Sequence, residues 1–356
     1  MNGSFPNTGL RFGEWENGRK RKNMSKVGII ANPASGKDIR RLVSHATVVS
    51  NNEKTDIIKR VILGLDSTGV EEVLIMPDYY GMGIRAKEAL NHHSVSCRVN
   101  VMEFEIQGNQ EDSTVAARMM QQENVDCIIT LGGDGTNRVV SKGCGRIPLI
   151  AISTGTNNVF PVMTEGTTAG IAAGLLARKI VNTEEVSATM KKIKFCAAGR
   201  EKDIALIDAV VVTEAFIGAR ALWDLENVKQ IFLTRAEPGS IGFSSIGAAL
   251  HPVGCQDPCG LLIELGTGGE KVKAPIAPGL IMEIEVKKYQ VMEPGEKVRI
   301  PFVPSIIALD GERELEIYGP EPYTFSLELD GPRLVDIAET IRRASRKGFF
   351  RSKERK

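Results

Sequence analysis

Short apolar runs alternate with amphipathic stretches over the first half of the chain. The runs are rich in β-branched residues and end at Gly, Pro, Asn or Asp, which is typical of strands; they cover residues 27–31, 72–76, 97–101, 127–131 and 148–152. Between them, apolar residues recur every three or four positions, which predicts helices over residues 54–65, 83–90, 112–122 and 168–178. The alternation predicts an α/β, doubly wound domain, with helices on both faces of a parallel sheet.

From about Met190 the pattern becomes a series of strand-like runs separated by Gly and Pro. The runs cover residues 193–197, 205–212, 231–234, 261–264, 281–286, 306–308, 314–317 and 325–329. Such a series, with few helical patterns, predicts a β-rich, antiparallel second domain. Residues 333–344 are helical again, since Leu334, Ile337, Ala338 and Ile341 share one face.

The length of 356 residues suits two domains of moderate size. We expect an α/β domain over residues 26–185, a β-rich domain over 190–330, and a C-terminal helix with a basic tail over 331–356. Residues 1–25 are polar and contain no apolar stretch of signal-peptide type, so we interpret them as a leader or a disordered extension. Met24 would then be a plausible natural start.

Composition narrows the classes of partner. The net charge is +1, so no global field favours nucleic acid or a membrane surface, and an anionic ligand has to be bound by local geometry. No run approaches the roughly 18 apolar residues of a transmembrane segment. The six cysteines are scattered, several of them in strand-like runs, which fits reduced thiols. We expect a cytoplasmic protein with no nucleic-acid partner and no transmembrane segment.

Three loops that follow predicted strands share one design. Each combines glycines, which let backbone N–H groups approach an anion, with hydroxyl or amide side chains, and each precedes a helical or helix-like stretch. The ends of neighbouring parallel strands are where such sheets bind ligands. The candidate nucleotide-binding residues are Asn32, Ser35 and Gly36 in the first loop, Gly132, Gly133, Gly135, Thr136 and Asn137 in the second, and Thr154, Gly155, Thr156, Asn157 and Asn158 in the third.

The middle loop also contains an acid, Asp134. A carboxylate repels phosphate unless it binds a cation or accepts a proton from an attacking hydroxyl, and both roles belong to phosphoryl transfer. The alternative is a structural one, in which Asp134 braces its own loop in an Asx turn. The chain contains no Gly-x-x-x-x-Gly-Lys-Ser/Thr motif, so a P-loop nucleotide site is unsupported.

Taken together, these loops resemble the superfamily of NAD kinases and diacylglycerol-type lipid kinases. The run from Leu131 to Thr136 is similar to its shared signature, and Asn32-Pro33 with Ser35-Gly36 is similar to the phosphate loop of the lipid-kinase branch. The run from Gly155 to Pro161 is similar to the acetoin-catabolism protein X type of NAD-kinase-like protein. The second half adds two elements, namely Asp310-Gly311-Glu312, as in lipid kinases, and the run from Gly239 to Ser245, as in the dinucleotide-contacting stretch of NAD kinases.

The resemblance implies a nucleotide site between the two domains and a C-terminal helix that returns to the first. It implies transfer of a phosphoryl group from ATP, with Mg²⁺, to a hydroxyl of a small-molecule acceptor, NAD being the leading one. By resemblance, Asp134 is the metal partner or general base, Asn157 and Asn158 bind ribose or adenine, and Ser240 contacts the dinucleotide. Asp310 and Glu312 become candidates for Mg²⁺ or for the acceptor side. The family context also suggests a homo-oligomer.

Departures from the NAD-kinase pattern keep two other functions open. The Asn-Glu pair that holds the acceptor ribose in NAD kinases has only one acid, Asp208, in the nearest stretch here, and Ile241, Gly242 and Phe243 replace Thr, Ala and Tyr. A lipid or polyol kinase would need an apolar acceptor channel in the second domain. A non-catalytic nucleotide-binding regulator would keep the loops without transfer.

One further cluster was weighed as a metal site. His251, Cys255 and Cys259 are evenly spaced, but nothing nearby supplies a clear fourth ligand for zinc. A loop with two free thiols is therefore the favoured interpretation.

Overall fold

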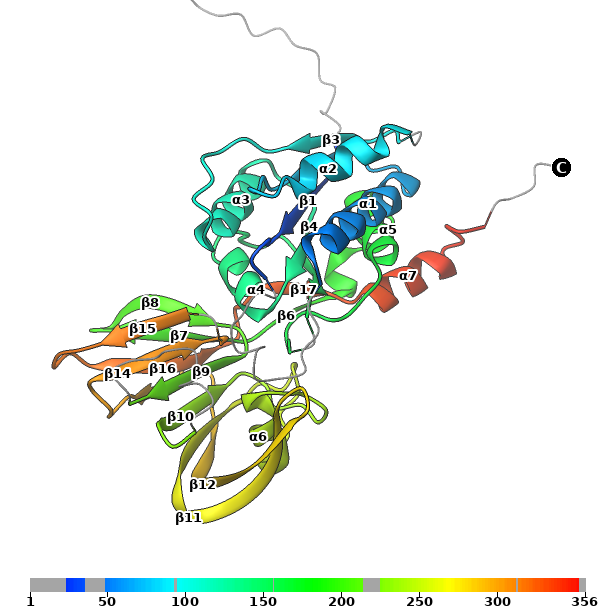
Figure 1. Cartoon of the computed structure of the whole chain (residues 1–356). Helices are drawn as coiled ribbons and strands as arrows, with labels where there is room; N and C mark the ends of the chain where they lie inside the picture. The colour runs from blue at the N-terminus through cyan, green and yellow to red at the C-terminus, as the bar shows by residue number, and fades with distance from the viewer. Residues whose placement is uncertain are drawn as a thin grey trace, which may run out of the picture.

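A seven-stranded sheet organises the N-terminal half of the chain (Figure 1). The computed structural model describes residues 24–35, 49–92, 95–155, 157–213, 225–311 and 313–351. Its first sheet has the order β3-β2-β1-β4-β5-β17-β6, and all neighbouring strands are parallel except β17 and β6. The strands are β1 (Lys26–Ala31), β2 (Glu72–Ile75), β3 (Arg98–Val101), β4 (Cys127–Gly132), β5 (Leu149–Ser153), β6 (Ser187–Thr189) and β17 (Arg333–Val335).

Helices cover both faces of this sheet, as the sequence predicts. One face packs against α1 (Asn51–Ser67), α2 (Met82–Ala89) and α5 (Gly166–Ala177), and the other against α3 (Glu111–Gln122) and α4 (Asp134–Ser141). Two short 3₁₀ helices are η2 (Leu90–His92) and η3 (Thr183–Glu185). The last helix, α7 (Ile337–Arg346), packs against α5, so the end of the chain returns to the first domain (Figure 1).

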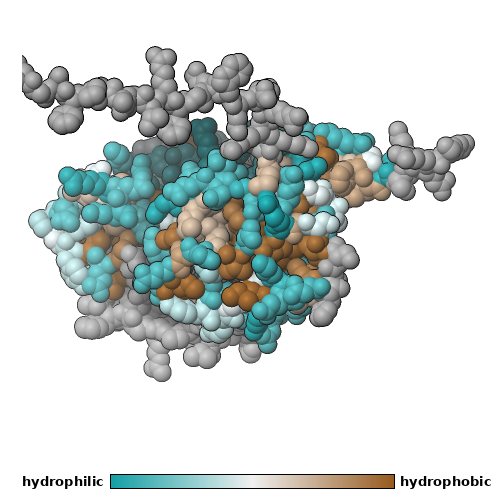
Figure 2. Space-filling model, turned by 90° about the horizontal axis from the view of Figure 1, so that it is seen from above, coloured by the Kyte–Doolittle hydropathy of each residue, from teal (hydrophilic) through white to brown (hydrophobic). Residues whose placement is uncertain are grey.

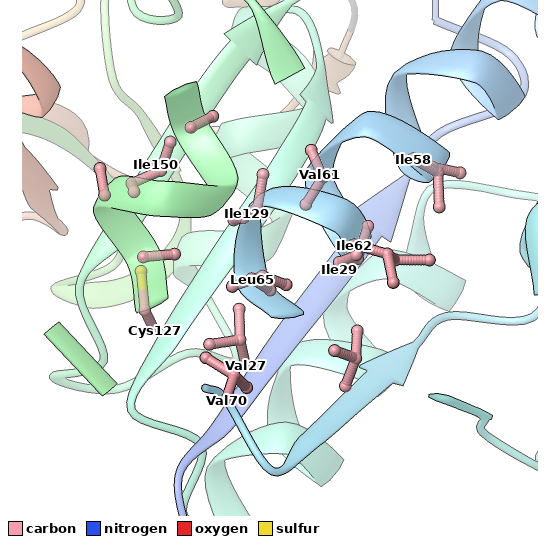
Figure 3. Close-up of a cluster of buried hydrophobic side chains, with 14 of the residues drawn as sticks. Val27, Ile29, Ile58, Val61, Ile62, Leu65, Val70, Cys127, Ile129 and Ile150 are labelled. Carbon is pink, nitrogen blue, oxygen red and sulfur yellow. The ribbon is translucent and has the colours of Figure 1, made fainter. Parts of the chain in front are cut away.

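Strand geometry explains why two cores form. Successive side chains of a strand point to opposite faces, so Ile29 lies in the core under α1 and Ile30 in the core under α3. Figure 3 shows Val61 and Leu65 of α1 above Ile29 and Ile129 of the sheet. Burying one such side chain contributes roughly 1.5–3 kcal/mol.

Two antiparallel sheets form the second half, as predicted. The larger has the order β12-β11-β10-β9-β14-β15 and the smaller β13-β16-β7-β8. Their facing sides share one core, where the rings of Phe232 and Phe325 lie 4.5 Å apart. The elements are β7 (Lys192–Ala197), β8 (Arg200–Ala205), β9 (Asp208–Val212), β10 (Val228–Leu233), α6 (Phe243–Leu250), β11 (Gly260–Ala277), β12 (Leu280–Met292), β13 (Lys297–Arg299), β14 (Ser305–Leu309), β15 (Arg313–Ile317) and β16 (Tyr323–Glu328).

Three local predictions were wrong. Residues 205–212 form two strands, β8 and β9, because the chain breaks at Leu206 and Ile207 to bind Asp310. Residues 333–335 form a strand of the first sheet rather than the start of the C-terminal helix. The short helix α6 was not predicted, since a run rich in Ser and Gly carries little helical signal.

The outer surface is mixed in character. On the face seen from above in Figure 2, apolar patches lie between hydrophilic residues. Within the described residues, none of the helices combines the length and apolarity that a membrane span requires.

Close packing of α1 on α5 depends on glycine. A Cβ at Gly170 would lie 2.2 Å from the carbonyl oxygen of Val61, and one at Gly64 would lie 2.4 Å from that of Thr167. Because these neighbours are backbone atoms, they cannot rotate away. The two helices approach each other at a distance that no larger residue permits.

Gly170→Ala is therefore expected to lower the free energy of unfolding by about 1–3 kcal/mol, measured by urea titration. In an unobstructed helix the same change stabilises by up to about 1 kcal/mol, so the sign is diagnostic. Glu88→Ala, at an exposed position of α2, is the control and should change stability by less than about 0.5 kcal/mol. An unchanged or raised stability of Gly170→Ala would show that the two helices can separate freely.

Candidate active site

The topology of the first sheet selects one place for a ligand. From β1 the chain moves outward to β2 and β3, and it then crosses back to β4 and β5 on the other side. The loops that follow β1 and β4 therefore leave a switch point in opposite directions, and α/β sheets bind ligands in the crevice that forms there. These are the loops that begin at Asn32 and at Gly133.

Hydrogen bonds join the three predicted loops to one another. The Asn32 backbone N–H donates to the Leu131 carbonyl at 3.1 Å, and its side-chain amide donates to the Thr136 hydroxyl at 3.0 Å. The hydroxyls of Ser35 and Thr154 lie 3.0 Å apart, and the Thr154 N–H donates to the Gly132 carbonyl at 3.3 Å. The three loops therefore meet at one edge of the sheet.

The first two glycines of the middle loop allow this close approach. A Cβ at Gly132 would lie 2.4 Å from the Thr136 side chain, and one at Gly133 would lie 2.7 Å from the Asn158 side-chain oxygen. Gly135 is buried in the first turn of α4. The Gly155 carbonyl accepts hydrogen bonds from Ser153 and Asn158. These glycines therefore allow the loops to pack closely against each other. The sequence analysis had expected them only to let backbone N–H groups approach an anion.

The predicted polar residues fall into two groups. Thr136, Asn137 and Thr154 are fully buried, and their side chains bond within the protein; the Asn137 amide, for example, accepts from the Thr130 hydroxyl and donates to the Gly133 carbonyl. Asn157, Asn158 and Ser240 are half-buried. The first group builds the scaffold, and binding roles for both groups stay predictions. Gly36, Thr156 and Glu312 lie outside the described residues.

The middle loop runs directly into a helix. Gly133 is the N-cap of α4, so the helix begins at Asp134 with its positive end at the switch point. The third loop continues through an extended segment, in which Val162 pairs with Ile152, and α5 starts only at Gly166. The helix predicted over residues 168–178 is α5, which follows the third loop only after this extended segment.

Asp134 links the middle loop to the third. Its half-buried carboxylate accepts the backbone N–H of Phe160 at 2.7 Å and that of Val159 at 3.1 Å. It thus holds a segment 25 residues away, rather than its own loop in an Asx turn. Burial and the nearby Asp310 carboxylate raise the pKa of Asp134 to about 7, against the lowering effect of the two amides and of Arg235.

The second domain contributes Asp310 to this junction. This buried residue has φ +48°, and its carboxylate accepts the backbone N–H groups of Leu206, Ile207 and Asp208 at 2.8–3.2 Å. Burial raises the pKa of Asp310, and the Arg138 guanidinium opposes that rise. Among the described residues, no group of three or more His, Cys, Asp or Glu side chains could hold a metal ion. The role of Asp310 as a magnesium ligand stays a prediction.

Comparisons with known proteins agree with the fold. Residues 27–180 match the ATP-NAD kinase N-terminal domain, and residues 191–330 match the acetoin catabolism protein X C-terminal domain. Acetoin catabolism protein X of Cupriavidus necator is 39% identical over 337 residues, which cover 92% of this chain and 94% of the relative. The chain belongs to the acetoin catabolism protein X family. Its fold is that of a NAD kinase-like protein.

A buried arginine, which was not among the predicted site residues, connects the two domains. Arg138, one turn after Asp134 on α4, is fully buried. Its guanidinium donates to the Asp203 carboxylate at 3.2 Å and to the Gln110 side chain at 3.0 Å, and its Nε lies 3.7 Å from the Asp310 carboxylate. Lys142 pairs with the same Asp203. No sequence motif marks these residues, because the carboxylate partners of Arg138 lie 65 or more positions away.

Lys54 was also missed. The fully buried ammonium donates to the carbonyls of Asn32 and Ser35, at 2.9 and 2.8 Å, and so places a positive charge under the first loop. The sequence does contain a signal for it. Lys54 occupies the apolar face of α1 together with Ile57, Ile58 and Val61, and a charge at such a position needs a buried partner.

Arg138→Met is expected to lower the free energy of unfolding by about 3–5 kcal/mol, because it leaves two buried carboxylates without their shared cation. Thermal or urea unfolding measures the change. The matched control is Arg342→Met, which breaks an exposed pair with Glu339 on α7 and should leave the unfolding midpoint unchanged. Equal effects of the two substitutions would show that the buried network does not hold the domains together.

Proposed function

We propose that this protein is a kinase that transfers a phosphoryl group from ATP to an alcohol, with Asp134 as general base. The observation that carries the proposal is the Asp134 carboxyl, whose pKa of about 7 lies near the operating pH, at the edge of the sheet where the three loops meet. A general base works best when its pKa is close to the operating pH.

In the proposed reaction the acceptor oxygen forms a bond to the terminal phosphorus of ATP. The bond from that phosphorus to the bridging oxygen breaks and leaves ADP, and the acceptor proton passes to the Asp134 carboxylate. The amides of Val159 and Phe160 orient the carboxylate. The positive end of α4 and the Lys54 charge favour phosphate at the two neighbouring loops. Positioning and charge supply most of the catalysis.

The donors around Asp134 suit Mg²⁺ held partly by substrate. Mg²⁺ prefers oxygen ligands and is commonly bound by one or two carboxylates, with phosphate oxygens and water completing the shell. A carboxylate has about four acceptor positions, and Asp134 uses part of them on the two amides. Bound Mg²⁺ would neutralise charge on the phosphates. Asp310 and Glu312 remain the second-domain candidates for it.

NAD is our leading acceptor, because the first domain belongs to the ATP-NAD kinase type. In that reading Asn157 and Asn158 bind the ribose or adenine, and Ser240 contacts the dinucleotide. The protein would then work in the cytoplasm, where it would supply NADP. Self-association is part of this proposal by analogy with the family.

A lipid or polyol kinase is the second candidate, and one pocket favours it. A mainly apolar pocket of about 510 Å³ lies between the segment that follows Phe160 and the start of α7, where Met163, Leu334, Ile337 and Ile341 line it. Since the Phe160 amide binds Asp134, an acceptor with an apolar part could use this pocket. It adjoins the first domain, whereas the expected channel was in the second.

Purified protein with ATP and Mg²⁺, offered NAD, diacylglycerol or small polyols in separate assays, distinguishes the candidates. Phosphorylated NAD supports the leading proposal, and a phosphorylated lipid or polyol supports the second candidate. Saturable binding of ATP and NAD without any product would favour a third, a non-catalytic nucleotide-binding regulator. Such a regulator would be linked to acetoin catabolism, after the name of the relative.

Asp134→Asn is expected to reduce turnover at least about 100-fold while ATP affinity changes little, because the amide keeps the shape but cannot accept the proton. Steady-state kinetics and nucleotide titration measure the two effects. Unchanged turnover would remove Asp134 from the mechanism.

Stability provides the control for folding of Asp134→Asn. The folded-state pKa of Asp134 lies above the model-peptide value, so its ionisation costs stability as the pH rises from about 4 to about 7. Asparagine does not ionise. The variant should therefore unfold at the same or a higher temperature than the wild type at pH 8, and the difference should disappear near pH 4.

Turnover of the wild type should rise with pH and level off above about 7, because only the ionised carboxylate accepts a proton. The measurement is kcat/KM between pH 5.5 and 9. Affinity for ATP, measured over the same range, is the control and should not follow the same curve. A flat profile would contradict general-base catalysis by Asp134.

A further inference from the structure

Arg235 is a largely buried cation that forms no ion pair with a described residue, although its charge reaches the Asp134 carboxylate. It follows β10 and is only 7% exposed. Its guanidinium forms no hydrogen bond or ion pair with any residue that the structure describes. Arginine is rarely buried to this degree unless it is paired. Since Arg235 has no atom among the fully buried polar atoms without a partner, its unbonded guanidinium is accessible and is free to bind a group other than the described side chains.

The side chain reaches from the second domain to the first. The Arg235 guanidinium carbon lies 5.6 Å from the centre of the Phe160 ring, in a cation–π contact. The backbone N–H of the same Phe160 donates to the Asp134 carboxylate at 2.7 Å. Phe160 therefore contacts both Arg235 and the proposed base, and the charge of Arg235 also reaches the Asp134 carboxylate.

The backbone fixes Arg235 at this place. The preceding residue, Thr234, donates its N–H to the Ile207 carbonyl at 2.9 Å and its hydroxyl to the Leu206 carbonyl at 2.6 Å. Leu206 and Ile207 are the residues whose amides bind Asp310. The turn that anchors the second domain at the junction thus also orients the arginine.

A second buried cation, Lys191, interacts electrostatically with Arg235. Lys191 is 5% exposed, and its ammonium donates to the carbonyls of Gly254 and Cys259 at 2.9 and 2.7 Å. Burial lowers the pKa of Lys191, and the charge of Arg235 adds to this effect, whereas Cys259 and Asp257 oppose it. Two cations in mutual reach make this side of the junction attractive to an anion.

We propose that Arg235 binds an oxyanion group, a phosphate or a carboxylate, on the acceptor alcohol whose hydroxyl is presented to Asp134, and so restricts the kinase to anionic acceptors. The planar guanidinium, which lies over the Phe160 ring, offers the paired N–H donors that bind both groups in bidentate fashion. This inference rests on the proposed kinase function. It excludes glycerol and other neutral alcohols as good acceptors, and NAD satisfies it through its diphosphate.

The test compares three alcohols of one shape, namely glycerol, glycerate and glycerol 3-phosphate, together with NAD. Binding of each to the full chain is measured by calorimetry in the presence of Mg²⁺ and a non-hydrolysable ATP analogue. We expect one or more of the anionic compounds to bind at least about tenfold more tightly than glycerol, as a charged hydrogen-bonded pair provides. A preference for glycerate or for a phosphate compound identifies the anion.

Arg235→Gln should abolish this preference and leave affinity for the ATP analogue unchanged. The matched control is Arg299→Gln, at an exposed position of the second domain, which should retain the preference. Arg235→Lys should retain part of it, because the charge stays while the paired donors are lost. Equal weakening of glycerol, the anions and the ATP analogue by Arg235→Gln would overturn the proposal, as would equal affinities of the wild type for glycerol and the anions.

Two further measurements, the stability of Arg235→Gln and the formation of a phosphorylated product, distinguish a binding role of Arg235 from a structural one and anion binding from kinase activity. If Arg235 serves binding, Arg235→Gln should unfold at the same or a higher urea concentration than the wild type, since a buried unpaired charge is removed. A clearly lower unfolding midpoint would show a structural role and overturn the proposal. Selective binding without any phosphorylated product would leave the anion site intact and overturn the kinase function alone.

Discussion

Charges buried between the two domains have to be balanced within the protein, and this constraint determines the site. Arg138 balances two of these charges, because it pairs Asp203 and Asp310 of the second domain with α4 of the first. Because α4 begins at Asp134 and carries Arg138 one turn later, the same ion pairs hold Asp134 at the junction. An unpaired buried charge costs several kcal/mol, so the domains cannot shift here without a large loss of stability.

Two charged groups at the junction between the domains are not fully paired, and these groups are suited to bind and react with a ligand. Asp134 is buried near another acid and is shared with only two amides, so it exchanges its proton near neutral pH. Arg235, over the Phe160 ring, forms no ion pair with a described side chain, although its charge reaches the Asp134 carboxylate. A base and a cation on either side of one aromatic residue are suited to an alcohol with a neighbouring anionic group.

The three loops act as a preformed unit rather than as three separate ligand arms. Most of their buried hydroxyl and amide groups bond to each other, and the Lys54 ammonium donates hydrogen bonds to carbonyls of the first loop. Such mutual bonding fixes the backbone before a ligand arrives, which lowers the entropy that binding costs. The loops were recognisable in the sequence because glycine and hydroxyl residues recur after strands. The sequence did not show which loop residues hold the loops together, because this depends on hydrogen bonds such as that from Asn32 to Thr136.

The sequence by itself determined the two domain types, the alternation of strands and helices in the first domain, and the three loops. These features follow from periodicity and turn residues, which are local properties. It also singled out Asp134, as an acid among glycines. Only the tertiary structure decided which charges meet. Arg138 and Asp310 lie 172 positions apart, and the environment of Asp134 depends on burial by residues from both domains. Desolvation and ion pairing act through space, so no local pattern of residues encodes them.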